Sequence, residues 1–207
     1  MQKLCSEKDR VEYVGVFCGA DNKIPELFKK EAYTLGRAIG QNNYNLVTGA
    51  SRTGLMNEIM NGFIDQNGAG QIKGIIPSLF KDFDVHHQNL KDDNLIWTDT
   101  FHQRLQLFQN QCDVMIVLPG GFGTLHELMD FLVSCQFGQI RSKIILFNMH
   151  NFWDFLLHQF IVMVQNKTLI KRHLELIVVV STVAECMEAV RLNNNAQPNL
   201  ADRFWEI

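Results

Sequence analysis

Short apolar runs alternate with segments of helical periodicity along most of the chain, and this order constrains the fold more than any other feature. It is typical of a parallel sheet covered by helices, so we expect an α/β fold, a Rossmann-like doubly wound parallel sheet with helices on both faces. The expected strands are Tyr13–Cys18, Asn45–Thr48, Gln71–Ile76, Val114–Leu118, Lys143–Phe147 and Leu176–Val180. The expected helices are Pro25–Gly40, Leu55–Gln66, Thr100–Gln111, Thr124–Phe137, Trp153–Gln165 and Thr182–Arg191. In the fourth helix the stripe that we expect to face the sheet is Leu125, Leu128, Met129 and Leu132.

The length of 207 residues, 46% of them hydrophobic, suits one sizeable core rather than two. We therefore expect a single domain over residues 1–192 and a tail over residues 193–207, whose Phe204 and Trp205 suggest that its end docks on something. The long polar connection over residues 77–94 is either a functional lid or a mobile surface loop.

Charge and cysteine usage exclude several classes of protein. The 19 basic and 22 acidic side chains are spread along the chain, which argues against a nucleic-acid partner. Five of the first ten residues are charged and no apolar run could span a bilayer, so we expect a cytoplasmic protein without a membrane partner. The five cysteines lack a CxxC pair, which indicates reduced, mostly buried thiols and neither a metal nor a redox cofactor. They are Cys5, Cys18, Cys112, Cys135 and Cys186.

Three connections that follow expected strands are rich in small residues: Gly19–Asp21, Gly49–Gly54 and Gly120–Thr124. Ligands of open α/β sheets bind beyond the carboxyl ends of the strands. Glycines there bring backbone N–H groups close to an anion, and the helix that follows adds a partial positive charge. These connections therefore predict a phosphate site, although Gly19 and Gly49 could serve only tight turns between strand and helix.

Two well-known glycine-loop sites are excluded by the residues present. A P-loop requires a lysine between the last glycine and the hydroxyl residue, but Gly123 and Thr124 are adjacent. The dinucleotide fingerprint requires glycine or alanine where His126 stands. The sequence supports neither an NTPase nor an NAD enzyme.

The stretch from Pro119 to Glu127 reads P-G-G-F-G-T-L-H-E and resembles the P-G-G-x-G-T-x-x-E motif of the Lonely Guy family. That family comprises the cytokinin riboside 5'-monophosphate phosphoribohydrolases. It also has a Gly-Leu-Met element, which begins here at Gly54, and an arginine in an M-H-x-R-K element. That arginine corresponds to Arg104, 23 positions before Glu127, and the resemblance runs from about Tyr13 to Val190.

The resemblance implies a Rossmann-like homodimer that needs no cofactor. It also implies hydrolysis of the N-glycosidic bond of a nucleoside 5'-monophosphate, AMP or N6-substituted AMP, to free base and ribose 5-phosphate. The implied catalytic residues are Arg104 and Glu127. The implied substrate-binding and phosphate-binding residues are Gly19, Ala20, Gly49, Gly54, Met56, Gly120, Gly121, Phe122, Gly123 and Thr124. The chain departs from the family pattern at Ala50, Ser51, Leu105 and His126.

Other interpretations of the same residues stay open at this point. Thr124 to Glu127 also fits a T-x-x-E capping box, in which the glutamate only closes a helix end. Arg104 lies beside the apolar stripe Phe101, Leu105 and Phe108, where it could pack its stem and extend to solvent. A carrier that binds a nucleotide or cofactor without catalysis, such as a molybdenum-cofactor carrier of the same fold, is the alternative function.

Two further labels are disfavoured. A metal site among the seven histidines lacks ligand spacing, so we expect the adjacent His86 and His87 to be surface or lid residues that point in different directions. The label lysine decarboxylase, often attached to such sequences, would require a Schiff-base lysine, and none lies among the glycine loops.

Overall fold

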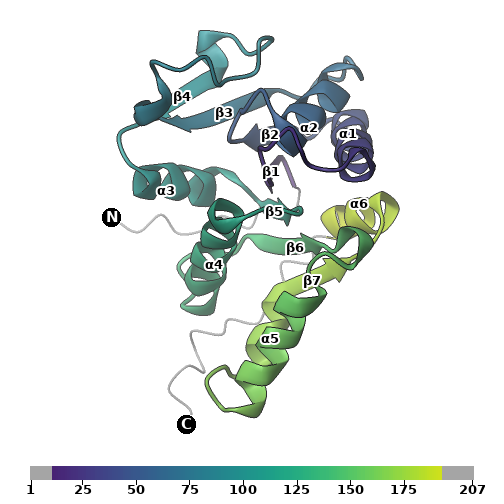
Figure 1. Ribbon diagram of the computed structural model, residues 1–207, viewed down its shortest axis with the longest axis vertical. Coiled ribbons are helices and arrows are strands. Elements are labelled where there is room, and N and C mark those ends of the chain that lie inside the picture. Colours follow the sequence, from purple (N-terminus) through teal and green to yellow (C-terminus); the bar gives the residue numbers. More distant parts are fainter. Residues whose placement is uncertain (1–10, 193–207) are drawn as a thin grey trace.

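The computed structural model describes residues 11–192, which form one seven-stranded parallel sheet with helices on both faces (Figure 1). The strand order is β4-β3-β2-β1-β5-β6-β7. Their bounds are β1 Tyr13–Phe17, β2 Asn45–Thr48, β3 Ile72–Pro77, β4 Leu95–Thr98, β5 Val114–Val117, β6 Lys143–Phe147 and β7 Ile177–Val180. The chain winds outward from β1 to β4 and then returns to β5 beside β1. The predicted doubly wound sheet is confirmed, with its topological switch point between β1 and β5.

Each of the six expected helices is present. They are α1 Glu26–Gln41, α2 Gly54–Ile64, α3 Phe101–Gln111, α4 Phe122–Gln136, α5 Asp154–Gln165 and α6 Val183–Arg191. Short 3-10 helices are η1 Ser78–Phe80, η2 Asp92–Asn94, η3 Met149–Asn151 and η4 Lys171–Leu176. None of the helices between residues 11 and 192 has both the length and the apolar character that crossing a bilayer requires.

The core has two layers, one on each side of the sheet. Helices α1, α2 and α6 cover one face, where Leu35, Ile59 and Val190 pack together, and α3, α4 and α5 cover the other (Figure 1). Val16 and Phe17 on β1 point to opposite layers, and both are fully buried. Burial on both sides explains why the strands read as continuous apolar runs.

Strand β4 is the element that the sequence did not predict. Its four residues, Leu-Ile-Trp-Thr, follow a polar stretch and occupy the edge of the sheet, where the two middle residues are only half-buried. An edge strand is less buried than a central one and so has a shorter apolar run, which makes its hydrophobic pattern in the sequence hard to recognise. The glycine loop at Gly120 therefore follows the fifth strand of the chain, not the fourth.

The inward face of α4 also differs from the expected stripe. Leu128 is fully buried, whereas Leu125, Met129 and Leu132 are half-buried. The buried residues of this helix are Thr124, Glu127, Leu128, Phe131, Ser134 and Cys135. The expected stripe does face the core, because Leu125, Met129 and Leu132 pack against the same cluster as Leu128. The inward face is wider than that stripe, since it includes the polar residues Thr124 and Glu127, which hydrophobic periodicity alone does not predict.

Four of the expected reduced cysteines lie within the described residues, and all four are buried and free, which confirms that part of the prediction. They are Cys18, Cys112, Cys135 and Cys186. Cys5 and the tail over residues 193–207, with Phe204 and Trp205, lie outside the described residues.

Candidate active site at the carboxyl edge of the sheet

The three predicted glycine loops meet above the carboxyl ends of β2, β1 and β5. The Gly19 N–H donates to the Pro119 carbonyl oxygen over 2.9 Å, which joins the first loop to the third. The Leu55 N–H donates to the Gly19 carbonyl oxygen over 2.9 Å, which joins the first loop to the second. Loops distant in the sequence thus form one continuous surface at the switch point of the sheet, as predicted.

The third loop leaves backbone open at the start of α4. A Cβ added at Gly121 or Gly123 would meet no atom within 4 Å, whereas one added at Gly120 would collide with Oγ1 of Thr124. Gly120 is therefore required for packing, whereas Gly121 and Gly123 are exposed and have open space beside their backbone. The first N–H groups of a helix lack intrahelical partners and carry partial positive charge, so this position can receive an anion such as phosphate.

Two residues of this loop point in opposite directions. Thr124 is buried, with its side chain against Gly120, whereas Phe122 is 92% exposed and projects from the first turn of α4. An exposed aromatic ring beside an anion-binding terminus is available to a ligand.

Arg104 and Glu127 form an ion pair between α3 and α4. Nη1 of Arg104 lies 2.5 Å from Oε1 of Glu127, and each residue is only 6% exposed. Nε of Arg104 donates to the Ile75 carbonyl oxygen over 3.0 Å, and the guanidinium carbon lies 4.9 Å from the centre of the Phe108 ring. These contacts fix the guanidinium at the end of β3 and hold it against the carboxylate.

Burial sets the protonation behaviour of this pair. It raises the pKa of the Glu127 carboxyl, and the Arg104 charge and hydrogen bond oppose that rise. A raised carboxyl pKa suits a group that accepts or releases a proton near neutral pH. Burial, with the negative charge of Glu127, also raises the pKa of Cys18 well above its usual value, so this thiol is neutral. Cys18 was not predicted as a site residue, because nothing in its sequence spacing distinguishes it from a core thiol.

The second glycine loop forms the wall beside Arg104. A Cβ added at Gly49 would lie 2.7 Å from Nη2 of Arg104 and 3.1 Å from Sδ of Met56. Gly54 has a φ of 63°, and a Cβ there would lie 2.5 Å from the Ala20 carbonyl carbon. Gly49 and Met56 therefore border the ion pair, while Gly54 and Ala20 shape the junction of two loops.

The polar connection between β3 and β4 packs against the second glycine loop. The Arg52 N–H donates to the Val85 carbonyl oxygen over 2.8 Å, and the His87 N–H donates to the Ala50 carbonyl oxygen over 2.9 Å. The Arg52 guanidinium also pairs with the Asp84 carboxylate. These bonds attach the connection to the candidate site, and its role as a lid stays a prediction.

His87 corrects one sequence expectation. The residue is 1% exposed, so it is not a surface residue. Nδ1 of its ring accepts from the Asn89 N–H over 3.2 Å, and Nε2 lies 3.0 Å from Oδ1 of Asn61. Both nitrogens thus find partners inside the protein, which allows an imidazole to be buried. The His86 ring turns toward Trp97 instead, so the two rings diverge as expected.

The two structural alternatives for Glu127 and Arg104 are wrong. Helix α4 begins at Phe122 after the N-cap residue Gly121, so Glu127 lies beyond the first turn and bonds to Arg104 rather than closing the helix end. A true T-x-x-E capping box occurs elsewhere, between Thr182 and Glu185 at the start of α6. The guanidinium of Arg104 is buried and paired, not extended to solvent.

Comparisons with known proteins agree with this geometry. A family profile described as "Possible lysine decarboxylase" matches residues 56–190. A cytokinin riboside 5'-monophosphate phosphoribohydrolase of Rhodococcoides fascians is 32% identical over 141 residues, which are 68% of this chain and 69% of that protein. The chain belongs to the Lonely Guy family. A family member from Arabidopsis thaliana, named a cytokinin riboside 5'-monophosphate phosphoribohydrolase, is 31% identical over 72% of this chain and 68% of its own length.

Coverage of the Lonely Guy relatives is partial. A probable cytokinin riboside 5'-monophosphate phosphoribohydrolase of Oryza sativa is 28% identical over 72% of this chain, but the match spans only 64% of that relative. Among solved structures, the molybdenum cofactor binding protein of Rippkaea orientalis superposes with a TM-score of 0.65 at 23% identity. The superposition covers 87% of this chain and 96% of the Rippkaea orientalis protein. At that identity the likeness shows a shared fold and no more.

Proposed function

We propose that this Lonely Guy family member hydrolyses the N-glycosidic bond of a nucleoside 5'-monophosphate, AMP or N6-substituted AMP, to free base and ribose 5-phosphate. The observation that carries the proposal is the buried ion pair of Arg104 and Glu127, which lies on the same edge of the sheet as the open backbone of Gly121 and Gly123. The relatives named as phosphoribohydrolases support a hydrolase of this class.

In the proposed mechanism the phosphate binds at the start of α4. The open backbone of the third loop and the helix terminus supply N–H donors and positive potential. An anchored phosphate fixes the ribose, which turns the attack of water into a reaction within a preassembled complex. The unphosphorylated nucleoside lacks this anchor and is expected to be a poor substrate.

Bond cleavage divides between the two charged residues. As the bond between C1' and the base nitrogen breaks, its electron pair goes to the base and the ribose gains oxocarbenium character. The Glu127 carboxylate stabilises that cation and accepts a proton from the water that adds to C1'. The Arg104 guanidinium donates a hydrogen bond to the departing base, which offsets its growing negative charge. The base then takes up one proton, which balances the proton that the water gives to Glu127, and leaves as the neutral free base.

A carrier function is the second candidate, because solved neighbours of the same fold include a molybdenum cofactor binding protein and a molybdenum cofactor carrier protein. A carrier would need the loops but would not need a carboxylate of raised pKa held against a buried guanidinium. Replacing a whole buried ion pair by well-packed apolar residues is often neutral or stabilising by about 1–4 kcal/mol, so such a pair is costly to retain without a use. Its presence favours the enzyme.

We also propose a homodimer, in agreement with the family resemblance. Large apolar side chains are exposed along α4 and α5, on the outside of one helical layer. They include Val133, Phe137, Phe155, Ile161 and Met163. Exposed apolar side chains are common where a protein forms an interface, and these are the ones that we propose the partner covers. Sedimentation equilibrium tests this proposal: the wild type should be a dimer and Phe155→Asp a monomer, and a wild-type monomer would contradict it.

The decisive experiment compares AMP with adenosine. Purified protein is expected to release adenine from AMP, as detected by chromatography, and to leave adenosine intact. Because one acid–base residue contributes about 10²- to 10⁴-fold, Glu127→Gln should lower turnover by at least about 10². The variant should still melt in one cooperative transition, at a lower temperature because the buried Arg104 loses its charged partner. The exposed Glu188→Gln is the matched control and should keep full turnover.

Three results would contradict the proposal. Equal turnover of AMP and adenosine would exclude the phosphate anchor. Full turnover by Glu127→Gln would exclude the catalytic carboxylate, and tight binding of AMP without release of adenine would favour the carrier. Turnover of AMP, GMP, CMP and isoprenylated AMP, measured side by side, identifies the preferred base.

A further inference from the structure

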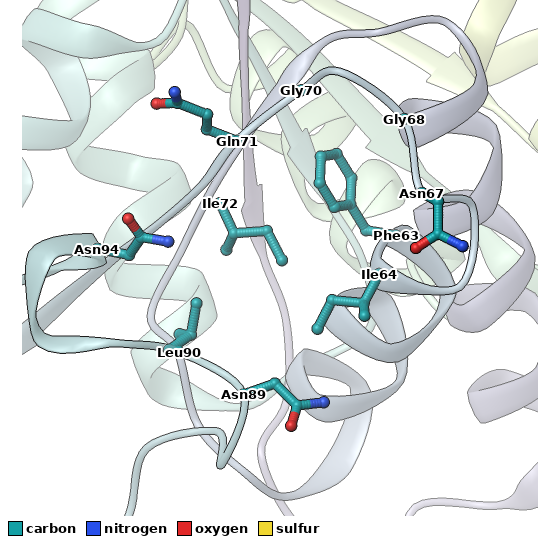
Figure 2. Close-up of a pocket in the computed structure, with 10 residues that line it drawn as sticks. All are labelled: Phe63, Ile64, Asn67, Gly68, Gly70, Gln71, Ile72, Asn89, Leu90 and Asn94. Atoms are coloured by element: carbon teal, nitrogen blue, oxygen red, sulfur yellow. The ribbon is translucent and has the colours of Figure 1, made fainter.

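A cavity of about 320 Å³ opens at the amino edge of β3, far from the candidate active site (Figure 2). Helix α2 relates the two places, because it begins at Gly54 beside the glycine loops and ends at Ile64 in the cavity wall. Eleven residues of helix span about 16 Å. A small molecule in this cavity would therefore not touch Arg104 or Glu127.

The lining of the cavity divides into an apolar floor and a polar edge. Figure 2 shows four apolar side chains, Phe63, Ile64, Ile72 and Leu90, directed into the space. Four residues of the rim have carboxamide side chains: Asn67, Gln71, Asn89 and Asn94. Figure 2 shows the Asn94 side chain directed toward the space and the Gln71 side chain directed away from it. None of the residues that line the cavity within the described chain carries a charge.

This lining selects a neutral ligand with hydrogen-bonding edges. A phosphate or carboxylate would lose its water without gaining a cation, which is unfavourable. A carboxamide offers both donors and an acceptor, and asparagine or glutamine pairs in bidentate fashion with N6 and N7 of adenine. The floor of Phe63, Ile72 and Leu90, all buried, is suited to the face of a flat ring. The volume is within the range of small-molecule sites, about 300–1,000 Å³.

The wall over residues 67–71 is fixed by its own contacts. The Ala69 N–H donates to Oδ1 of Asn43 over 3.1 Å, and the Gln71 N–H donates to Oδ1 of Asn45 over 2.9 Å. A Cβ added at Gly70 would collide with the Tyr44 carbonyl oxygen, so this turn is packed directly on the start of β2. A wall held in this way loses little freedom when a ligand binds.

We propose that this cavity is a second ligand site that binds a neutral planar heterocycle of the free purine base class. The site goes beyond the proposed function, because its lining and location are independent of any hydrolysis at the carboxyl edge. Its ligand is recognised by carboxamide pairing at the edge and by apolar contact with the floor.

Isothermal titration of the full chain with adenine tests the site. Saturable binding with one adenine per chain is expected for the wild type. Leu90→Trp fills the floor and should abolish binding. Asn94→Leu, at a half-exposed position, removes one carboxamide and should weaken adenine at least about fivefold, the lower limit for loss of a bidentate pair. Phe122→Ala at the other edge is the matched control and should bind adenine as the wild type does.

The outcomes separate this site from the nucleotide site. Absence of saturable adenine binding by the wild type overturns the proposal, as does equal affinity in the wild type and Asn94→Leu. Loss of adenine binding in Phe122→Ala also overturns it, because the base would then occupy the carboxyl edge. If Leu90→Trp does not give a cooperative melting transition, the variant is unfolded, and the adenine affinity of Asn94→Leu then tests the proposal. Turnover of AMP is measured on the same samples, so failure of the hydrolase proposal is recorded independently.

Discussion

Gly49 lies against the guanidinium of Arg104, so closely that a Cβ at position 49 would come within 2.7 Å of Nη2. We expect Gly49→Ala to displace the arginine, because Nη2 is the atom that the added methyl group would approach most closely, with Sδ of Met56 next at 3.1 Å. Misplacement of a reacting group by about 1 Å can cost about 10² in rate. Turnover of AMP by Gly49→Ala should therefore fall by about that factor, measured alongside the melting temperature.

Ser51→Ala is the control for this substitution. It changes the same loop, but the Ser51 hydroxyl contacts the Thr53 hydroxyl rather than the arginine. Its turnover should match that of the wild type. Wild-type turnover in Gly49→Ala would show that the position of Arg104 does not limit the reaction.

The pH dependence of turnover should report the ionisation of Glu127. The carboxylate is the active form in the proposed mechanism, so kcat/KM should fall as pH drops through the pKa of this group. Burial raises that pKa above the ordinary glutamate value of 4.5, which places the acid limb of the profile above pH 4.5. The measurement is kcat/KM for AMP across the range in which the protein stays folded.

Arg104→Gln provides the matched variant for the pH profile. The arginine charge lowers the pKa of Glu127, so its removal should move the acid limb to still higher pH, in addition to reducing the maximal rate. An acid limb at the same pH in both proteins would assign the ionisation to another group.

The parts of the fold that the sequence predicted are those with a strong local signal. Continuous apolar runs such as Val114–Val117 and amphipathic stretches such as α1 specify their own secondary structure, and six strands and six helices were placed correctly. Strand β4 was missed because Leu95–Thr98 gains its strand geometry from pairing with β3. Such a long-range contact leaves no recognisable pattern in a segment of four residues.

The candidate site divides in the same way. Arg104 and Glu127 were found through motif spacing, and the convergence of the glycine loops followed from the rule that ligands bind at the carboxyl edge. The pairing of His87 with Asn61 and the position of Cys18 beside the ion pair depend on packing between separate elements. No local pattern encodes such contacts, so sequence reasoning had no means to find them.

His87 should make stability depend on pH. Burial lowers the pKa of its imidazole, and Glu58 opposes that shift. Because the folded pKa lies below the unfolded value of about 6.5, the stabilisation is present above that pH and is lost as pH falls through the folded pKa. Between about pH 7.5 and pH 5 the wild type should therefore lose more thermal stability than His87→Gln, which has no imidazole to protonate.

A histidine on the surface controls for general acid effects on stability. His158 is exposed on α5, and His158→Gln should follow the pH dependence of the wild type. Parallel melting curves for the wild type and His87→Gln over this range would show that the buried imidazole does not control the loss of stability.

Two threonines that share the T-x-x-E pattern should respond differently to the same change. The Thr182 hydroxyl accepts from the Glu185 N–H over 3.2 Å as the N-cap of α6, so Thr182→Ala should cost about 1 kcal/mol of stability and leave turnover unchanged. Thr124 lies within α4, buried against Gly120, so Thr124→Ala leaves the helix cap intact and instead opens space behind the proposed phosphate loop.

We expect a raised KM for AMP in Thr124→Ala but not in Thr182→Ala. Chemical denaturation and steady-state kinetics on both proteins check this contrast, and an equal KM for both would remove the proposed role of the loop in holding phosphate.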